Sequence, residues 1–288
     1  MIPCIGLASG LGAGNKGCGE GPLVLQKNLD LSLDWKEMIL PEASHQDLTD
    51  SIAFVNQRVA HLAHGLTREN SFFLSFGGDH SCGIGVWSGV SSALKAKGDL
   101  GLIWIDAHMD AHTPQTSESG NIHGMPLAVL LGHGDPKLTS ISGSFPKLKP
   151  ENLVLIGVRS FESGEAELLK RLNVRVYFME EIFQRGLLSI LGEALEIVSK
   201  NTAGYGISFD LDSIDPNSIG AVGTPEAGGI DPQEFLRSLS IFQEFPPIAF
   251  ELVEYNPFLD EDSKSFNFIR EVLSVKISLL KKNTNTIF

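Results

Sequence analysis

The chain has 288 residues and a mass of 31.2 kDa, with 42% hydrophobic and 20% charged residues. This composition is typical of a globular protein and excludes a disordered, collagen-like or disulfide-scaffold chain. Its 22 basic and 35 acidic residues give a net charge of −13 and a pI near 5.0. Nucleic acid and anionic membranes require a basic face, so neither is expected as a partner.

Two further features of the sequence concern its compartment. No apolar run approaches the roughly 18 residues that a membrane-spanning helix needs, and the first residues lack the basic segment of a secretion signal. The three cysteines are an odd number and form no Cys-x-x-Cys pair, which favours a reduced environment. We therefore expect a cytoplasmic protein with no membrane partner.

Short β-rich runs alternate with longer helical patterns along the chain. The expected strands are Ile2–Leu7, Glu37–Leu40, Phe72–Phe76, Gly101–Ile105, Leu153–Gly157, Val174–Phe178, Gly206–Phe209 and Ile248–Leu252. The expected helices are Leu48–Leu66, Ser81–Ala96, Glu165–Leu172, Met179–Ser199, Pro232–Phe242 and Asp262–Leu280. Such alternation predicts βαβ crossovers and a mostly parallel sheet with helices on both faces. Because no linker or internal repeat divides the chain, a single α/β domain over residues 1–288 is expected.

Acidic and histidine residues follow three of the expected strands, where open α/β sheets bind their ligands. The three segments are Gly77-Gly78-Asp79-His80-Ser81, Asp106-Ala107-His108-Met109-Asp110 and Asp210-Leu211-Asp212-Ser213-Ile214-Asp215-Pro216. Alternate side chains of an extended chain point the same way, so Asp106, His108 and Asp110 converge. Asp210 and Asp212 converge for the same reason. With His80, these residues supply six side chains of the kind that ligate metals.

The charge of these six side chains constrains what they can do together. Four carboxylates about 5 Å apart repel one another by roughly 3 kcal/mol per pair at an effective dielectric of 20, or on the order of 20 kcal/mol in total. That sum exceeds the roughly 5–15 kcal/mol that stabilises a domain. Either the carboxylates do not cluster, or cations neutralise them. Two divalent ions cancel the charge, and carboxylate and imidazole ligands without thiolate favour Mn²⁺.

Each of the three segments also has an ordinary interpretation. A single Asp-x-His-x-Asp motif is compatible with a solvated loop, and Asp212 with an Asx turn or cap before Asp215-Pro216. Because all three segments lie at the ends of expected strands, their occurrence together favours a site for two metal ions.

Together the three segments resemble the metal-binding signatures of the ureohydrolase family, which contains arginase, agmatinase and their relatives. The resemblance extends from Gly19-Glu20-Gly21-Pro22 to Glu254-Tyr255-Asn256-Pro257. It implies a three-layer α/β/α sandwich around an eight-stranded sheet, a homotrimer or homohexamer, and two Mn²⁺ ions per subunit. The implied ligands of one ion are His80, Asp106, Asp110 and Asp210. Those of the other are His108, Asp106, Asp210 and Asp212.

The same resemblance implies hydrolysis of a guanidino substrate to urea and an amine by a hydroxide that bridges the two metal ions. In this interpretation Asp110 orients the hydroxide, Glu254 binds the guanidinium group, and His123 transfers a proton to the leaving amine. Thr224 matches a position that lines the pocket. Taken alone, Glu254 is also compatible with a surface carboxylate, His123 with a loop histidine bonded to backbone, and Thr224 with an ordinary turn.

The substrate is predicted from the loops around the expected pocket. Ser119 and Asn121 match arginase residues that contact the α-carboxylate of an amino acid. Glu162 and Glu165 fall where arginases place acids near the α-amino group. L-arginine, cleaved to L-ornithine and urea, is therefore the expected substrate.

Three residues depart from the arginase pattern. His112 stands where arginases carry Asn, Glu162 stands where they carry the shorter Asp, and Glu226 after Gly-Thr-Pro is more like some non-arginase relatives. The alternatives are an agmatinase, a guanidinobutyrase or a formiminoglutamase-type enzyme. A non-catalytic metal-binding homologue would show a broken ligand set, which this sequence does not.

A nucleotide-binding loop is a weaker alternative. The segment Gly12-Ala13-Gly14-Asn15-Lys16-Gly17 fits Gly-x-Gly-x-x-Gly after the first expected strand. However, Cys18-Gly19-Glu20-Gly21-Pro22 prolongs the loop where a helix should begin beneath the phosphates. A tight loop at the pocket rim explains these glycines better.

Overall fold

The computed structural model describes residues 1–42 and 47–284, which contain an eight-stranded sheet. The strands are β1 Ile2–Leu7, β2 Leu33–Ile39, β3 Phe73–Gly77, β4 Asp99–Ile105, β5 Leu153–Val158, β6 Arg175–Phe178, β7 Thr202–Asp210 and β8 Ala249–Val253. Their order is β2-β1-β3-β8-β7-β4-β5-β6, and every neighbouring pair is parallel. The expected α/β fold with eight strands is confirmed, and the sheet is entirely rather than mostly parallel.

Helices connect the strands and differ from the expected ones in a few places. They are α1 Gly21–Asn28, α2 Leu48–Arg68, α3 Gly83–Leu94, α4 Pro126–Leu130, α5 Pro136–Thr139, α6 Ser163–Leu172, α7 Met179–Arg185, α8 Leu187–Ser199, α9 Pro232–Ser238 and α10 Lys264–Thr284. The prediction of one helix over Met179–Ser199 was wrong. Gly186 separates α7 from α8 with a φ of 79°, a conformation that glycine adopts without strain.

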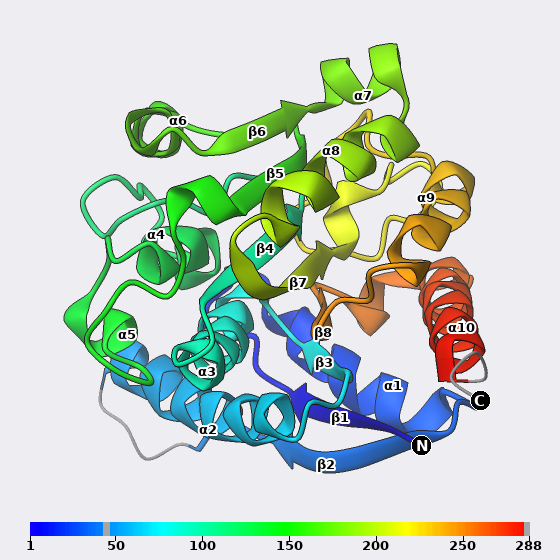
Figure 1. The fold of residues 1–288 in the computed structure, drawn as a ribbon, viewed down its shortest axis with the longest axis horizontal. Helices are drawn as coiled ribbons and strands as arrows, with labels where there is room; N and C mark the ends of the chain where they lie inside the picture. Colours follow the sequence, from blue (N-terminus) through cyan, green and yellow to red (C-terminus); the bar gives the residue numbers. More distant parts are fainter. Residues whose placement is uncertain (43–46, 285–288) are drawn as a thin grey trace.

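The helices form a layer on each face of the sheet (Figure 1). On one face, α8 and α10 pack on the sheet through residues such as Ile190 and Phe268. On the other face, α2 and α3 pack on it through residues such as Val59 and Trp87. Each face of the sheet therefore has its own hydrophobic core, which is the three-layer sandwich that the family resemblance implies.

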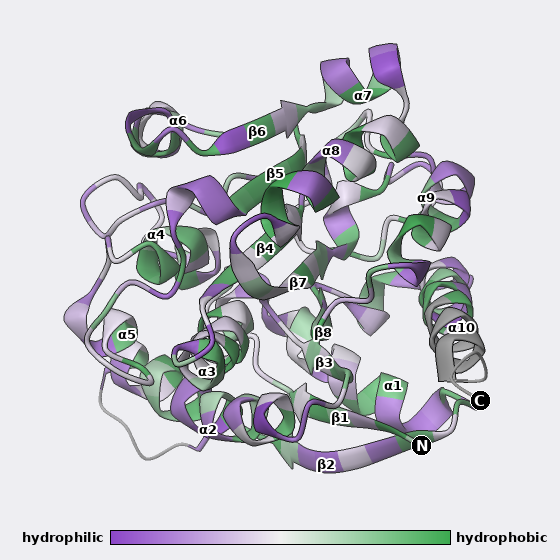
Figure 2. Cartoon of the chain, viewed as in Figure 1, coloured by the Kyte–Doolittle hydropathy of each residue, from purple (hydrophilic) through white to green (hydrophobic). Residues whose placement is uncertain are grey.

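Hydropathy follows the position of each strand in the sheet. All residues of the inner strand β5 are buried and most are hydrophobic, whereas the edge strand β2 mixes charged and apolar residues and is largely half-buried (Figure 2). Strands covered on both faces need continuous apolar runs, which explains why the inner strands could be found in the sequence.

Four adjacent strands in the middle of the sheet, in the order β3-β8-β7-β4, position the candidate site. Because they are parallel, their carboxyl ends meet at one edge of the sheet. His80, Glu254, Asp210 and Asp106 lie just beyond or at these four ends. Within the described ranges, no helix combines the length and apolar character needed to cross a membrane.

Candidate active site

The segment after β3 is held in place by a buried aspartate. One carboxylate oxygen of Asp79 accepts a hydrogen bond from the amide of Ser81 (2.9 Å), which caps the 3-10 turn His80–Cys82. The other oxygen accepts from the amide of Gly12 (2.9 Å). A Cβ at Gly12 would lie 2.6 Å from Asp79 Oδ1. The glycine loop thus packs against the turn that presents His80.

The segments after β4 and β7 use the same local hydrogen bond. Asp106 Oδ1 accepts from the amide of His108 (2.7 Å), and Asp210 Oδ1 accepts from the amide of Asp212 (2.8 Å). Such Asx turns fix the orientation of each carboxylate. Two further site carboxylates, those of Asp110 and Glu254, sit on backbone with positive φ of 49° and 65°. Non-glycine residues rarely adopt this conformation, and it concentrates at functional sites.

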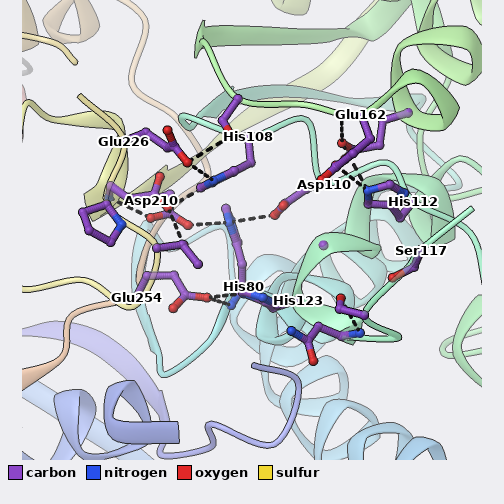
Figure 3. Close-up of a pocket in the computed structure, with 18 residues that line it drawn as sticks. His80, His108, Asp110, His112, Ser117, His123, Glu162, Asp210, Glu226 and Glu254 are labelled. Atoms are coloured by element: carbon purple, nitrogen blue, oxygen red, sulfur yellow. Dashed lines mark hydrogen bonds and ion pairs between the residues drawn. The ribbon is translucent and has the colours of Figure 1, made fainter. Parts of the chain in front are cut away.

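His80 lies at the centre of a buried group of carboxylates (Figure 3). Its Nδ1 atom is 3.1 Å from Asp106 Oδ2 and 2.9 Å from Asp210 Oδ2. Asp110 Oδ2 is 3.1 Å from the same nitrogen, and Asp110 and Asp210 approach it from opposite sides. Although both are buried, His80 Nδ1 and Asp110 Oδ2 make no hydrogen bond. Unpartnered buried polar atoms are costly, so this convergence of donor atoms fits a bound cation.

A second group of ligand atoms surrounds His108. Its Nδ1 atom is 3.1 Å from Asp212 Oδ2 and 3.5 Å from Asp106 Oδ1. Asp106 therefore faces His108 with one oxygen and His80 with the other. Two sets of side chains with metal-ligating atoms within 4.8 Å of one another share this carboxylate: His80, Asp106, Asp210 and Asp106, His108, Asp212.

The electrostatics of the two groups support a cation. Burial, followed by the charge of Asp106, raises the pKa of the Asp110 carboxyl to about 7. Burial also raises the pKa of Asp210 well above its usual range, with further contributions from Asp212 and Asp106. The carboxylates disfavour one another's charged form unless positive charge is added. Oxygen and imidazole donors, unpartnered atoms and excess negative charge together fit divalent metal ions.

Four residues that support these groups were not identified from the sequence. The Trp104 ring stacks on His80 at 4.0 Å, and its Nε1 donates to Asp106 Oδ2 (2.9 Å). His80 Nε2 lies 2.9 Å from the hydroxyl of Ser208. That hydroxyl donates to the buried carboxylate of Glu251 (2.6 Å), which also accepts from Trp87 Nε1 (2.7 Å). A charged residue inside the apolar run of β8 was the available signal for Glu251.

Glu254 and His123 form a buried pair beside the metal-ligand groups. Glu254 Oε1 lies 3.1 Å from His123 Nδ1 and accepts from the amide of His80 (2.9 Å). Burial disfavours the His123 imidazolium, but the hydrogen bond and charge of Glu254 outweigh it and raise the pKa of His123 to about 9. Burial likewise opposes ionisation of Glu254, yet its bonds to His123 hold its pKa below the usual value.

These residues surround one pocket of about 350 Å³. Every site residue predicted from the sequence lines it except Asp106, which is fully buried beneath. The lining also includes residues that were not predicted as contacts: Ser117, Gly124, Ser160, Pro225 and Glu226. The structure thus brings together the predicted metal ligands, His123, Glu254 and the predicted substrate contacts.

The rim of the pocket is formed by two loops. The hydroxyls of Ser117 and Ser119 accept hydrogen bonds from the amides of Gly120 (3.0 Å) and Asn121 (3.2 Å). Both hydroxyls can therefore still donate to a ligand. Beside Ser117 (Figure 3), His112 makes close contacts with two acids, Glu162 and Glu165.

The loop containing Thr224 is tied to the metal-ligand groups. The Thr224 hydroxyl donates to Asp212 Oδ2 (3.3 Å), and Glu226 Oε1 accepts from the Ser160 hydroxyl (3.1 Å). The guanidinium of Arg159 donates to the backbone carbonyls of Asp212 (2.7 Å) and Glu226 (2.8 Å). Thr224 thus lines the pocket as predicted and also orients Asp212.

Comparisons with known proteins agree with this geometry. The profile described as Arginase family matches residues 3–275. The arginase of Brevibacillus brevis is 42% identical over 223 residues, which cover 77% of this chain and 74% of that protein. The crystal structure of Bacillus cereus arginase has a TM-score of 0.87 at 33% identity, covering 96% and 97% of the two chains. An Entamoeba histolytica arginase, solved in complex with L-ornithine, gives 0.87 at 28% identity and the same coverage.

Proposed function

This chain belongs to the arginase family, and we propose that it hydrolyses L-arginine to L-ornithine and urea with two Mn²⁺ ions. Relatives in this family are metal-dependent hydrolases. One observation supports the proposal above all others. Two histidine and carboxylate groups share Asp106 at the floor of a pocket whose wall carries Glu254 and His123.

The residues at the floor fit the metals that the family requires. His80, Asp106, Asp110 and Asp210 would hold one ion, and His108, Asp106, Asp210 and Asp212 the other. Their donors are carboxylate oxygens and imidazole nitrogens without thiolate, a set that suits Mn²⁺. When bound, the two ions supply Lewis acidity that makes water a competent nucleophile at neutral pH.

Three side chains of the protein carry out the other steps: they bind the guanidinium group, orient the water and supply a proton. The Glu254 carboxylate binds the planar guanidinium group through charge-assisted hydrogen bonds. Asp110 orients the attacking water by accepting one of its protons in a hydrogen bond. As the carbon–nitrogen bond to the side chain of the substrate breaks, His123 supplies the proton that the departing amine requires. Its imidazole, next to Glu254, is held within reach of the same guanidinium group.

The rim supports an amino acid at the far end of the substrate. Ser119 and Asn121 offer a hydroxyl and an amide to an α-carboxylate, and Glu162 and Glu165 offer acids to an α-amino group. The similar Entamoeba histolytica arginase was solved in complex with L-ornithine, which supports an amino acid as the ligand of this family member. Agmatine has no carboxylate, so it leaves the donors at the rim unused.

One observation favours a second candidate, a guanidinobutyrase. Glu162, the acid expected to bind the α-amino group, is hydrogen-bonded to His112 instead. A substrate with a carboxylate and no amino group has no need of that acid.

Urea release tests the proposal and separates these candidates. Protein loaded with Mn²⁺, Co²⁺ or Ni²⁺ is assayed with L-arginine, agmatine and 4-guanidinobutyrate. Urea from L-arginine, greatest with Mn²⁺, is the expected result. No urea from any of the three substrates with any metal would contradict the hydrolase proposal, and urea from 4-guanidinobutyrate alone would replace arginase by the second candidate.

The single catalytic domain, the cytoplasmic location and the homotrimer or homohexamer stay predictions. Light scattering of the metal-loaded protein measures its assembly directly.

A further inference from the structure

A three-residue cluster at the pocket rim carries an inference about substrate selection. His112 Nε2 lies 2.8 Å from Glu162 Oε2 and 3.3 Å from Glu165 Oε2. The second ring nitrogen, Nδ1, lies 3.1 Å from the hydroxyl of Thr116. Both nitrogens of the imidazole therefore have partners within the rim, and the ring is held in one orientation.

The two acids of this cluster have different surroundings. The Glu165 side chain is almost fully buried, at 3% exposed, and its oxygens accept from the amides of Ala111 (3.1 Å) and Glu162 (3.1 Å). The Glu162 side chain is 66% exposed, and His112 is its close hydrogen-bonding partner. Both acids line the pocket, and Glu162, the more exposed of the two, is already bound by His112.

This arrangement affects only one of the two charged groups of an amino acid. The α-ammonium group of a substrate must compete with the His112 imidazole for the Glu162 carboxylate, because that imidazole is already hydrogen-bonded to it. An α-carboxylate meets Ser119 and Asn121, whose mutual hydrogen bond is separate from the pair. The rim therefore recognises the carboxylate freely and the ammonium group at a disadvantage.

We propose that His112 is the specificity-determining residue of the pocket. By binding Glu162 it weakens recognition of the α-ammonium group, so the pocket accepts ω-guanidino acids that lack this group nearly as well as L-arginine. The inference rests on the proposed guanidino hydrolysis and names the substrate class that this rim selects.

Two substrates that differ only in the α-amino group test the role of His112. For L-arginine and 5-guanidinopentanoate, we expect the wild-type kcat/KM values to lie within roughly tenfold of each other. His112→Asn should lower the KM for L-arginine roughly tenfold, the scale of one charge-assisted hydrogen bond, and leave that for 5-guanidinopentanoate unchanged. The gain should be absent from the H112N/E162Q double variant, because it acts through Glu162.

Controls make the result independent of turnover and of folding. His61→Asn removes an exposed histidine of α2 and should change neither KM. Calorimetry with L-ornithine and 5-aminopentanoate repeats the comparison as binding alone, and His112→Ala serves if H112N does not fold. Equal changes for both ligands, or no change, would overturn the role of His112. Absence of urea from both substrates in every variant would instead refute the hydrolase function, while the binding comparison still decides the inference.

Discussion

The floor of the pocket around His80 and its rim around His112 are both built from histidine and carboxylate side chains. At the floor, His80 Nδ1 and Asp110 Oδ2 lie 3.1 Å apart, and neither makes a hydrogen bond. At the rim, both nitrogens of His112 have partners, and one of these partners, Glu162, reaches solvent with a side chain that is 66% exposed. The same residue types thus leave buried polar atoms without hydrogen-bond partners at the floor, whereas the side chains at the rim bond to one another.

The difference between the two regions assigns them different tasks. The buried floor concentrates carboxylates around two histidines, a donor set that fits divalent cations, so changes there should act on metal binding and through it on all substrates. The rim is stable without a ligand, so changes there alter which substrate binds. Mutations at the floor should therefore affect metal content, and mutations at the rim should affect KM.

The largest effect is expected from Asp106→Asn, because Asp106 faces both histidines of the floor. Mutation of a residue that only supports a metal ligand lowers metal affinity roughly 10–100-fold. Loss of Asp106, which both groups share, should therefore lower metal affinity by more than about hundredfold. Elemental analysis after dialysis measures the change. Asp99→Asn, at the opposite end of β4, is the matched control and should retain metal. Normal manganese in D106N would refute the assignment.

A large effect on turnover, with no effect on metal content, is expected from His123→Ala. General acid catalysis contributes on the order of 10²–10⁴ in rate, and kcat should fall by that factor while bound manganese stays at the wild-type amount. His61→Ala on α2 provides the control. Wild-type kcat at every pH from 6 to about 10 would exclude a role for His123 in proton transfer.

A smaller effect on metal affinity is expected from a change to Ser208, which supports His80 without being a candidate metal ligand. Ser208→Ala breaks the link from His80 to Glu251 and should lower manganese affinity roughly tenfold, because outer partners orient a ligating imidazole. Ser88→Ala is a sharp control, since the Ser88 hydroxyl is buried and has no hydrogen-bond partner in the described part of the chain. Equal metal affinity in the two variants would show that the link is not needed.

The smallest expected effect concerns the pH dependence of the metal-free protein. The pKa of His123 is raised from 6.5 to about 9, so the stability it contributes is complete below pH 6.5 and is lost as the pH rises through about 9. Glu254→Gln removes the charge responsible and should lower this pKa by roughly one unit or more. NMR titration of the His123 ring measures the pKa directly.

The same variant should also change the stability profile. Between pH 6.5 and 9, the free energy of unfolding should fall more in the wild type than in E254Q, because only the wild type loses the charged pair. Parallel curves over that range would show that the two residues do not interact in solution.

The sequence predicted most of the fold because inner strands and amphipathic helices have distinct patterns. The run Gly101–Ile105, for example, lies within β4, which begins two residues earlier. The break at Gly186 was missed since the apolar pattern continues across it, and one glycine inside a helical pattern is not decisive. The short α4 was missed because five residues carry too little periodicity.

The candidate metal ligands could be found in the sequence for a similar reason, since they follow strands directly. The supporting residues were not, because their partners are far apart in the chain. Ser208 and Glu251 are separated by 43 residues, and His112 and Glu162 by 50. A sequence pattern within one segment indicates the conformation of that segment alone. These contacts depend instead on which distant segments the fold brings side by side.

The position of β8 in the sheet has a consequence for how the protein is made. In the strand order, β8 lies between β3 and β7, so it joins β2-β1-β3 to β7-β4-β5-β6. Among the described strands, β8 is also the last in chain order. The two halves of the sheet can therefore assemble during synthesis, but they are joined only when residues 249–253 emerge and insert between them. A nascent chain halted before β8 therefore carries all six candidate metal ligands but lacks Glu254 and the strand that joins the two halves of the sheet.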